Sequence, residues 1–106
     1  MSELTALNRL RYHLYKVFGF ARILKVELNF IDINNVSLII YFKVDCSEDL
    51  NADINALNEY LYNNFNLRCI NSRKTLTYIP PVKLEYASIT LEELGNIDTL
   101  CKMKGY

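Results

Sequence analysis

The sequence contains 106 residues, of which 51% are hydrophobic, and its 12 basic and 12 acidic side chains leave no net charge. This length corresponds to a single domain, residues 1–106, and two prolines and three glycines are too few for a linker or a disordered segment. No apolar run reaches the roughly 18 residues that span a bilayer, and residues 1–20 lack the apolar centre of a signal peptide. We therefore expect no membrane association and a location in the cytoplasm or an organelle matrix.

Few residues point to catalysis or to a bound metal. Cys46, Cys69 and Cys101 are far apart and form no C-x-x-C pair, so reduced structural cysteines are the simplest interpretation. His13 is the single histidine, and neither a nucleophile motif nor a glycine-rich phosphate loop accompanies it. We expect a protein that is not an enzyme and that uses no metal, no cofactor and no small-molecule substrate.

Charge is unevenly distributed along the chain. Residues 1–26 contain five basic side chains and one acidic side chain, a net charge of +4. Residues 27–66 contain one basic and seven acidic side chains, a net charge of −6, whereas residues 67–106 carry +2 from six basic and four acidic ones. The neutral total is thus compatible with a surface that has separate basic and acidic faces.

The first 44 residues predict a helix followed by a β-hairpin. Ser2 is a suitable N-cap, the helix should end near Gly19, and its apolar stripe would consist of Leu7, Leu10, Leu14 and Val17. Residues 23–33 alternate as in a strand, with one side formed by Leu24, Val26, Leu28 and Phe30. Asn34 and Asn35 tolerate positive φ and mark the turn. The second strand would have one side formed by Leu38, Ile40, Phe42 and Val44.

A second helix should follow, capped by Ser47 and with acidic residues in its first turn. Its apolar stripe would consist of Leu50, Ile54, Leu57, Leu61 and Phe65. The segment after it is ambiguous, because the letters NFN resemble a helix end and Leu67, Cys69 and Ile70 suit a short strand. The stripe can nevertheless be continued to Cys69 with a rotation, which favours a kinked helix over Asn63–Arg73.

The last third predicts a strand and a short helix. Val82, Leu84 and Tyr86 alternate with polar residues behind a pair of prolines, as in a half-buried strand. Thr90 and Glu93 have the spacing of a capping box for a C-terminal helix, and Ile89 and Leu94 that of the hydrophobic staple around it. The chain as a whole therefore predicts an α+β fold, a single two-layer domain with three main strands.

Three segments carry a resemblance to a known family: ALNE at residues 56–59, YIPPVKLEY at residues 78–86, and SI followed by IDTL at residues 97–100. In this order and spacing they resemble the ribosome-binding factor A family, small bacterial and organellar proteins that assist maturation of the small ribosomal subunit. The resemblance implies a KH type II-like fold, in the order helix, strand, strand, helix, kink, helix, strand, with a short C-terminal helix. It also implies a non-enzymatic RNA-binding role in rRNA processing, with small-subunit rRNA and the small ribosomal subunit as partners.

The chain departs from the family pattern at two places. The small-residue Ala-x-Gly motif that makes the family's kink is replaced by Tyr60, Leu61 and Tyr62. The basic, proline-containing connection between the family's first helix and first strand is shortened to residues 18–22.

Two groups of residues are candidates for RNA contact. The first presents cations for phosphates and tyrosine rings or amides for unstacked bases, and consists of Arg68, Arg73, Lys74, Tyr60, Tyr62, Asn63 and Asn64. The second lies on the first helix and consists of Arg9, Arg11 and Lys16. The structural alternative for both groups is tyrosines at the edge of the core and cations that are simply solvated.

Two function classes follow. The first is a monomeric RNA-binding factor for the small ribosomal subunit. The second is a protein-interaction module or homodimeric structural protein with no nucleic-acid role, in which Ile39, Tyr41 and other tyrosines form an adhesive sheet face.

Overall fold

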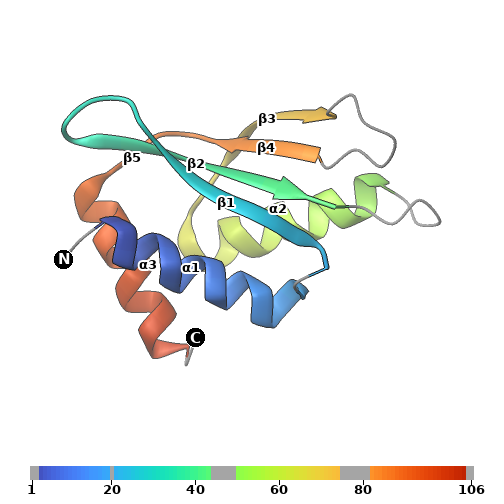
Figure 1. The fold of residues 1–106 in the computed structure, drawn as a ribbon, viewed down its shortest axis with the longest axis horizontal. Helices are drawn as coiled ribbons and strands as arrows, with labels where there is room; N and C mark the ends of the chain where they lie inside the picture. The colour runs from blue at the N-terminus through green and yellow to red at the C-terminus, as the bar shows by residue number, and fades with distance from the viewer. Residues whose placement is uncertain (1–2, 20, 44–49, 75–81, 105–106) are drawn as a thin grey trace.

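The computed structural model describes residues 3–19, 21–43, 50–74 and 82–104 and shows a single two-layer α+β domain, as the sequence predicts (Figure 1). The elements in chain order are α1 (Glu3–Phe18), β1 (Ile23–Phe30), β2 (Asn35–Phe42), α2 (Leu50–Phe65), β3 (Cys69–Lys74), β4 (Val82–Tyr86), β5 (Ile89–Thr90) and α3 (Leu91–Met103). The antiparallel sheet has the order β1-β2-β4-β3, and the short β5 pairs with the start of β2. All three helices cover the same face of the sheet. Among the described helices, none has both the length and the apolarity needed to cross a bilayer.

The predicted β-hairpin is confirmed, although its turn is built differently. β1 ends at Phe30 rather than at Ile33, and Asp32 organises the connection. One carboxylate oxygen of Asp32 accepts hydrogen bonds from the backbone N–H groups of Asn34 and Asn35, at 2.8 and 2.9 Å. Neither asparagine has the positive φ that the sequence suggested. The turn is therefore stabilised by hydrogen bonds to the Asp32 side chain, and not by asparagines in the left-handed conformation.

β1 carries a β-bulge that changes which residues face the core. The register with β2 shifts between Ile23 and Lys25, so that Ile23 is buried and Leu24 is 47% exposed. Phe30, at the far end of the strand, is also exposed. The prediction that Leu24 shares the side of Val26 is wrong, because one extra residue in the bulge reverses the alternation there. Phe30 does lie on the core side, opposite the buried Val36, but it is exposed because the strand extends beyond its helical cover.

The core face of α1 is rotated from the expected stripe. Leu10 and Leu14 are buried as predicted, but Val17 is exposed and His13 takes a buried position beside them. The helix ends where expected, at Gly19, which has a φ of +92° and whose N–H donates to the Tyr15 carbonyl. The proposed cap Ser2 lies outside the described residues. The rotation follows from packing against α2 and α3, since the position of His13 faces aromatic side chains of α2.

α2 buries the predicted apolar stripe at Leu57, Leu61 and Phe65, but it ends at Phe65. The proposed cap at Ser47 and the acidic first turn beside it lie outside the described residues. Asn66 follows the helix with a φ of 57°, and its N–H donates to the Tyr62 carbonyl at 3.0 Å. A residue in this left-handed conformation closes a helix and turns the chain away from its axis.

The kinked helix predicted over Asn63–Arg73 is therefore wrong. β3 begins at Cys69 and pairs antiparallel with β4, so that Asn71 lies opposite Glu85 and Arg73 opposite Lys83. The observed order is helix, strand, strand, helix, strand, strand, short strand, helix, which is not the KH type II-like order. The physical reason is that the edge of β4 offers β3 a full ladder of backbone hydrogen bonds, which a second helical segment would leave unpaired.

The C-terminal part follows the prediction closely. Val82, Leu84 and Tyr86 face the core, and the Tyr86 hydroxyl donates to the amide oxygen of Asn58 on α2 at 2.7 Å. The capping box is present in both directions. The Thr90 hydroxyl accepts from the Glu93 N–H, and a Glu93 carboxylate oxygen accepts from the Thr90 N–H, each at 3.1 Å. The paired prolines lie outside the described residues.

The end of α2 can be tested by two substitutions at one position. In left-handed backbone Ala is strained and Gly is not, so Asn66→Gly should exceed Asn66→Ala in free energy of unfolding by about 1 kcal/mol. If the helix continued through this position, the order would reverse by a similar amount, because Ala is the better helix former. Urea unfolding of the two variants measures the sign, and a more stable Ala variant would contradict the helix end seen here.

Candidate functional site at the end of α2

The two arginines of α1 that the sequence proposed for RNA contact are held by other parts of the protein. An Nη atom of Arg9 lies 2.8 Å from a carboxylate oxygen of Asp98, whose side chain is 3% exposed. Arg11 donates to the backbone carbonyl of Val26 at 3.1 Å, on the edge strand β1. These contacts join α1 to α3 and cover part of an open sheet edge, so both arginines have structural roles.

Tyr60 also serves the core. Its hydroxyl lies 2.5 Å from Nε2 of His13, and its ring meets those of Phe18 and Phe65 in edge-to-face contacts. Burial lowers the pKa of His13, and the positive charges of Lys104 and of Lys16, in the last turn of α1, lower it further. Burial raises the pKa of Tyr60. This aromatic cluster is structural, because the Tyr60 ring stacks on His13 and contacts Phe18 and Phe65.

Tyr62 and Arg68, in contrast, form an exposed pair. Tyr62 lies on the outer side of the last turn of α2 and is 47% exposed. The guanidinium carbon of Arg68 lies 5.5 Å from the centre of the Tyr62 ring, as in a cation–π contact. Asn66 lies between them in the sequence and turns the chain, which brings Arg68 back beside the helix it has just left.

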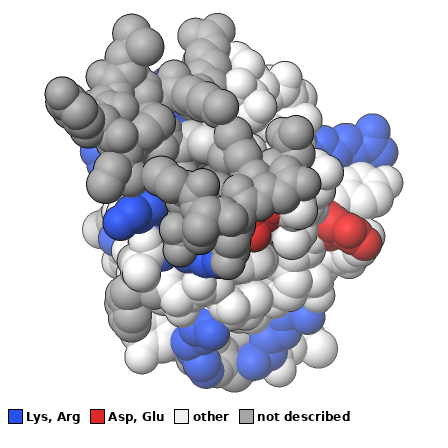
Figure 2. Space-filling view, turned by 90° about the vertical axis from the view of Figure 1, so that its right-hand side faces the viewer, with Lys and Arg blue, Asp and Glu red and all other residues white. Residues whose placement is uncertain are grey.

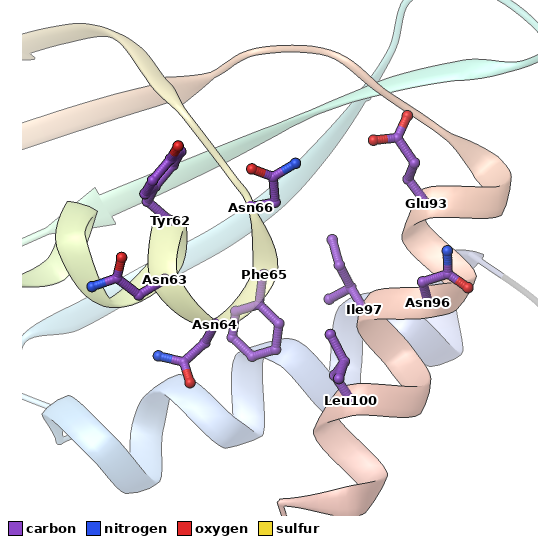
Figure 3. Close-up of a pocket in the computed structure, with 9 residues that line it drawn as sticks. All are labelled: Tyr62, Asn63, Asn64, Phe65, Asn66, Glu93, Asn96, Ile97 and Leu100. Atoms are coloured by element: carbon purple, nitrogen blue, oxygen red, sulfur yellow. The ribbon is translucent and has the colours of Figure 1, made fainter.

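A pocket of about 580 Å³ opens beside this pair, between the end of α2 and the face of α3 (Figure 3). Ile97 and Leu100 project from α3 toward Phe65 and give the pocket an apolar part. Polar side chains surround this part: Tyr62, Asn63, Asn64, Asn66, Glu93 and Asn96. Figure 3 shows the carboxamides of Asn66 and Asn96 on the two sides of the pocket, where they supply donors and acceptors that suit a flat ligand with a polar edge.

Hydrogen bonds already orient part of the rim. The Asn64 amide nitrogen donates to the Tyr60 carbonyl at 2.9 Å, and its oxygen accepts from the Lys104 ammonium at 2.9 Å. Glu93 belongs to the capping box of α3, so its position is held by the start of that helix. Asn64 near the end of α2 and Glu93 at the start of α3 are thus both held in position on the rim of the pocket.

The structure brings together only some of the residues proposed from the sequence. Tyr62, Asn63 and Asn64 line the pocket, and Arg68 stands beside it. Arg73 and Lys74 lie at the other end of β3, and five residues of extended strand from Arg68 to Arg73 correspond to about 17 Å. Their side chains are outside the described part of the structure.

Sequence reasoning missed the contribution of α3. Glu93, Asn96, Ile97 and Leu100 recur at spacings of three and four, which places them on one face of a helix. That spacing is visible in the sequence, but only the fold shows that this face meets the end of α2.

The face shown in Figure 2 has no single basic patch among its described residues, and the described part of the chain has no metal site. On the side of the molecule shown in Figure 2, the visible Lys and Arg side chains lie in separate groups rather than in one continuous patch. The described residues contain no group of three or more His, Cys, Asp and Glu side chains that could hold a metal ion. Burial raises the pKa of Cys101 to about 11, so this thiol is protonated near neutral pH.

The environment of His13 predicts a dependence of stability on pH. In the unfolded chain His13 titrates near pH 6.5, whereas its pKa in the fold is lower. Between these two values the unfolded state binds a proton that the folded state does not, so stability is complete above about pH 6.5 and falls as the pH drops below it.

Urea unfolding between pH 7.5 and 5.5 measures this effect, and His13→Gln is the matched variant. Glutamine does not titrate but keeps a polar group near the Tyr60 hydroxyl, so its stability should vary less with pH over this range. Because the chain has one histidine, equal pH dependence in both proteins would show that His13 is not the cause.

Comparison with known proteins does not assign a family or a function to this site. The chain matches no family model, no curated protein and no solved structure. The resemblance to the ribosome-binding factor A family therefore stays a prediction from the sequence segments, and the function must be argued from the residues of the site.

Proposed function

We propose that this protein is a non-enzymatic RNA-binding protein that takes an unstacked base of a single-stranded segment into the pocket between α2 and α3. The observation that carries the proposal is the exposed pair of Tyr62 and Arg68, 5.5 Å apart, at the rim of a pocket lined by carboxamides. Proteins recognise single-stranded RNA with aromatic rings that stack on bases, cations that contact phosphates and side chains that hydrogen-bond to base edges. This site has all three kinds of side chain in one place.

The chemistry of the pocket divides the contacts between base and backbone. The carboxamides of Asn66 and Asn96 can donate to and accept from the edge of a base, while Leu100, which is only partly buried, offers an apolar surface to its face. The carboxylate of Glu93 repels phosphate. The phosphate backbone should therefore pass outside, along Arg68, which is exposed and always charged.

The class of RNA comes from the family resemblance alone. It implies small-subunit rRNA, the small ribosomal subunit and the cytoplasm or an organelle matrix, where such subunits mature. The fold does not add support for this part of the proposal, because β3 occupies the place of the second half of the family's kinked helix. This part therefore rests on the quoted sequence segments.

Binding of single-stranded RNA across a salt series tests the pocket. Tyr62→Ala should weaken binding roughly 5- to 150-fold, the value of one stacked base, without changing the dependence on salt. Arg68→Ala should lower the slope of log K against log salt by about 0.7, the effect of one phosphate contact on a single strand.

The chain offers matched controls for both variants. Tyr12 on α1 is an exposed tyrosine outside this pocket, and Lys43 is an exposed cation at the end of β2. Tyr12→Ala and Lys43→Ala should bind RNA as the wild type does. Wild-type affinity in the Tyr62 and Arg68 variants, with unchanged thermal unfolding, would exclude this pocket as the site.

The ribosomal partner has a separate test. The protein should co-sediment with free small subunits but not with assembled ribosomes, and Tyr62→Ala should reduce the bound fraction. Binding of RNA oligonucleotides without co-sedimentation would keep the RNA-binding proposal and remove the ribosomal part of it.

A second function class, the protein-interaction module, is favoured by a different observation. Ile39 and Tyr41 lie on the face of the sheet that no described helix covers, and each is half-buried among charged neighbours. This face is on the opposite side of the sheet from the pocket, so the two functions are compatible.

A further inference from the structure

The uncovered face of the sheet carries its charges in two rows of opposite sign. The register between strands places Lys25 and Lys83 on either side of Tyr41, on β1 and β4. One step along the strands, Glu27 and Glu85 lie on either side of Ile39. We call the residues Lys25, Tyr41 and Lys83 the basic row, and Glu27, Ile39 and Glu85 the acidic row.

Within one molecule the two rows hold each other in place. The Lys25 ammonium lies 2.6 Å from a carboxylate oxygen of Glu27 and 5.9 Å from the centre of the Tyr41 ring, and Lys83 lies 3.4 Å from Glu85. The four charged side chains are nonetheless 28% to 61% exposed, so they can contact a partner without a rearrangement of the strands. The four charges of the two rows cancel, so the rows themselves supply no net charge with which to attract a polyanion.

We propose that this face binds a second copy of the chain, with the two sheets stacked so that their strands run in opposite directions. A twofold axis that lies in the interface, perpendicular to the strands and between the two rows, leaves each strand over its equivalent. Lys25 then faces the partner's Glu27, Lys83 faces the partner's Glu85, and Tyr41 packs on the partner's Ile39. Such an interface is self-complementary, as a twofold dimer requires.

Charge selects this arrangement from the alternatives. A twofold axis parallel to the strands would place basic row on basic row and acidic row on acidic row, and like charges across an interface are strongly disfavoured. The antiparallel stack converts both rows into attractive contacts. It also keeps the strand directions nearly aligned, which is a common geometry for two packed sheets.

The size of the face predicts a weak dimer. Four strands at about 4.8 Å spacing and a length of about 27 Å give on the order of 500 Å² per partner, near 1,000 Å² in total. That is the lower limit for a specific interface, and exposed ion pairs around a small apolar centre are screened by salt. A dissociation constant in the micromolar range or above, rising with ionic strength, is therefore expected, although the sequence alone suggested a monomer.

Charge reversal tests the proposal, with the oligomeric state measured by sedimentation at increasing protein concentration. Lys25→Glu with Lys83→Glu makes both rows acidic, and Glu27→Lys with Glu85→Lys makes both rows basic. Each variant should be monomeric where the wild type dimerises, with affinity reduced by at least about tenfold. An equimolar mixture of the two variants should associate again, because every contact then joins opposite charges.

A control on the helix layer separates this effect from that of net charge. Glu59→Lys with Glu92→Lys changes the total charge as much as the second variant does, at exposed positions of α2 and α3, and should dimerise as the wild type does. If a reversed variant fails to fold, Lys25→Gln with Lys83→Gln replaces it and should still weaken the dimer.

Three results would overturn the proposal. They are a wild type that stays monomeric at millimolar concentration, reversed variants that dimerise unchanged, and a mixture that does not associate. These results are independent of whether Tyr62→Ala loses RNA binding, because the residues of the pocket and those of the two rows lie on opposite sides of the sheet.

Discussion

The left-handed conformation of one residue, Asn66, determines how the second half of this fold is built. With a φ of 57° it ends α2, and the chain reverses so that β3 can pair with β4. A helix that ran on would leave β4 as an unpaired edge and would carry Arg68 away from Tyr62. The fourth main strand, the pocket beside α3 and the cation–π pair therefore all depend on a single turn. Asparagine is one of the few residues besides glycine that accept this conformation readily.

The elements that the sequence predicted well are those whose signals are local. The alternation in β2 and β4, the capping box of Thr90 and Glu93, and the stop at Gly19 each depend on neighbours within a few residues. The end of α2 has a local signal too, in the asparagines around Phe65. The apolar residues beyond it fit both a rotated helical stripe and a strand, and only pairing with β4, which is distant in sequence, separates the two.

Other features could not be predicted because they come from packing between elements. The bulge in β1 inserts one residue between Ile23 and Lys25 and turns Leu24 outward, although the alternation in the sequence is regular. The sequence likewise offered Arg9 and Arg11 as candidates for RNA contact, with a solvated helix face as the alternative. Arg9 instead reaches Asp98, which is 89 residues away along the chain, and Arg11 reaches a carbonyl of the sheet edge. A basic residue in the sequence is available to a nucleic acid only if the fold has not already given it a partner.

The layered arrangement also decides what a dimer would do for RNA binding. The pocket is built from α2 and α3 on the covered side of the sheet, whereas the two charged rows lie on the opposite side. Stacking through the sheets would therefore leave both pockets open and related by the twofold axis. A single RNA strand long enough to reach both would bind the second pocket as an intramolecular event, and its apparent affinity would exceed that of one pocket. If the pocket binds RNA as proposed, one pocket with Arg68 beside it would give modest affinity by itself, and pairing of the two sites would allow weak individual contacts to hold a long, flexible RNA.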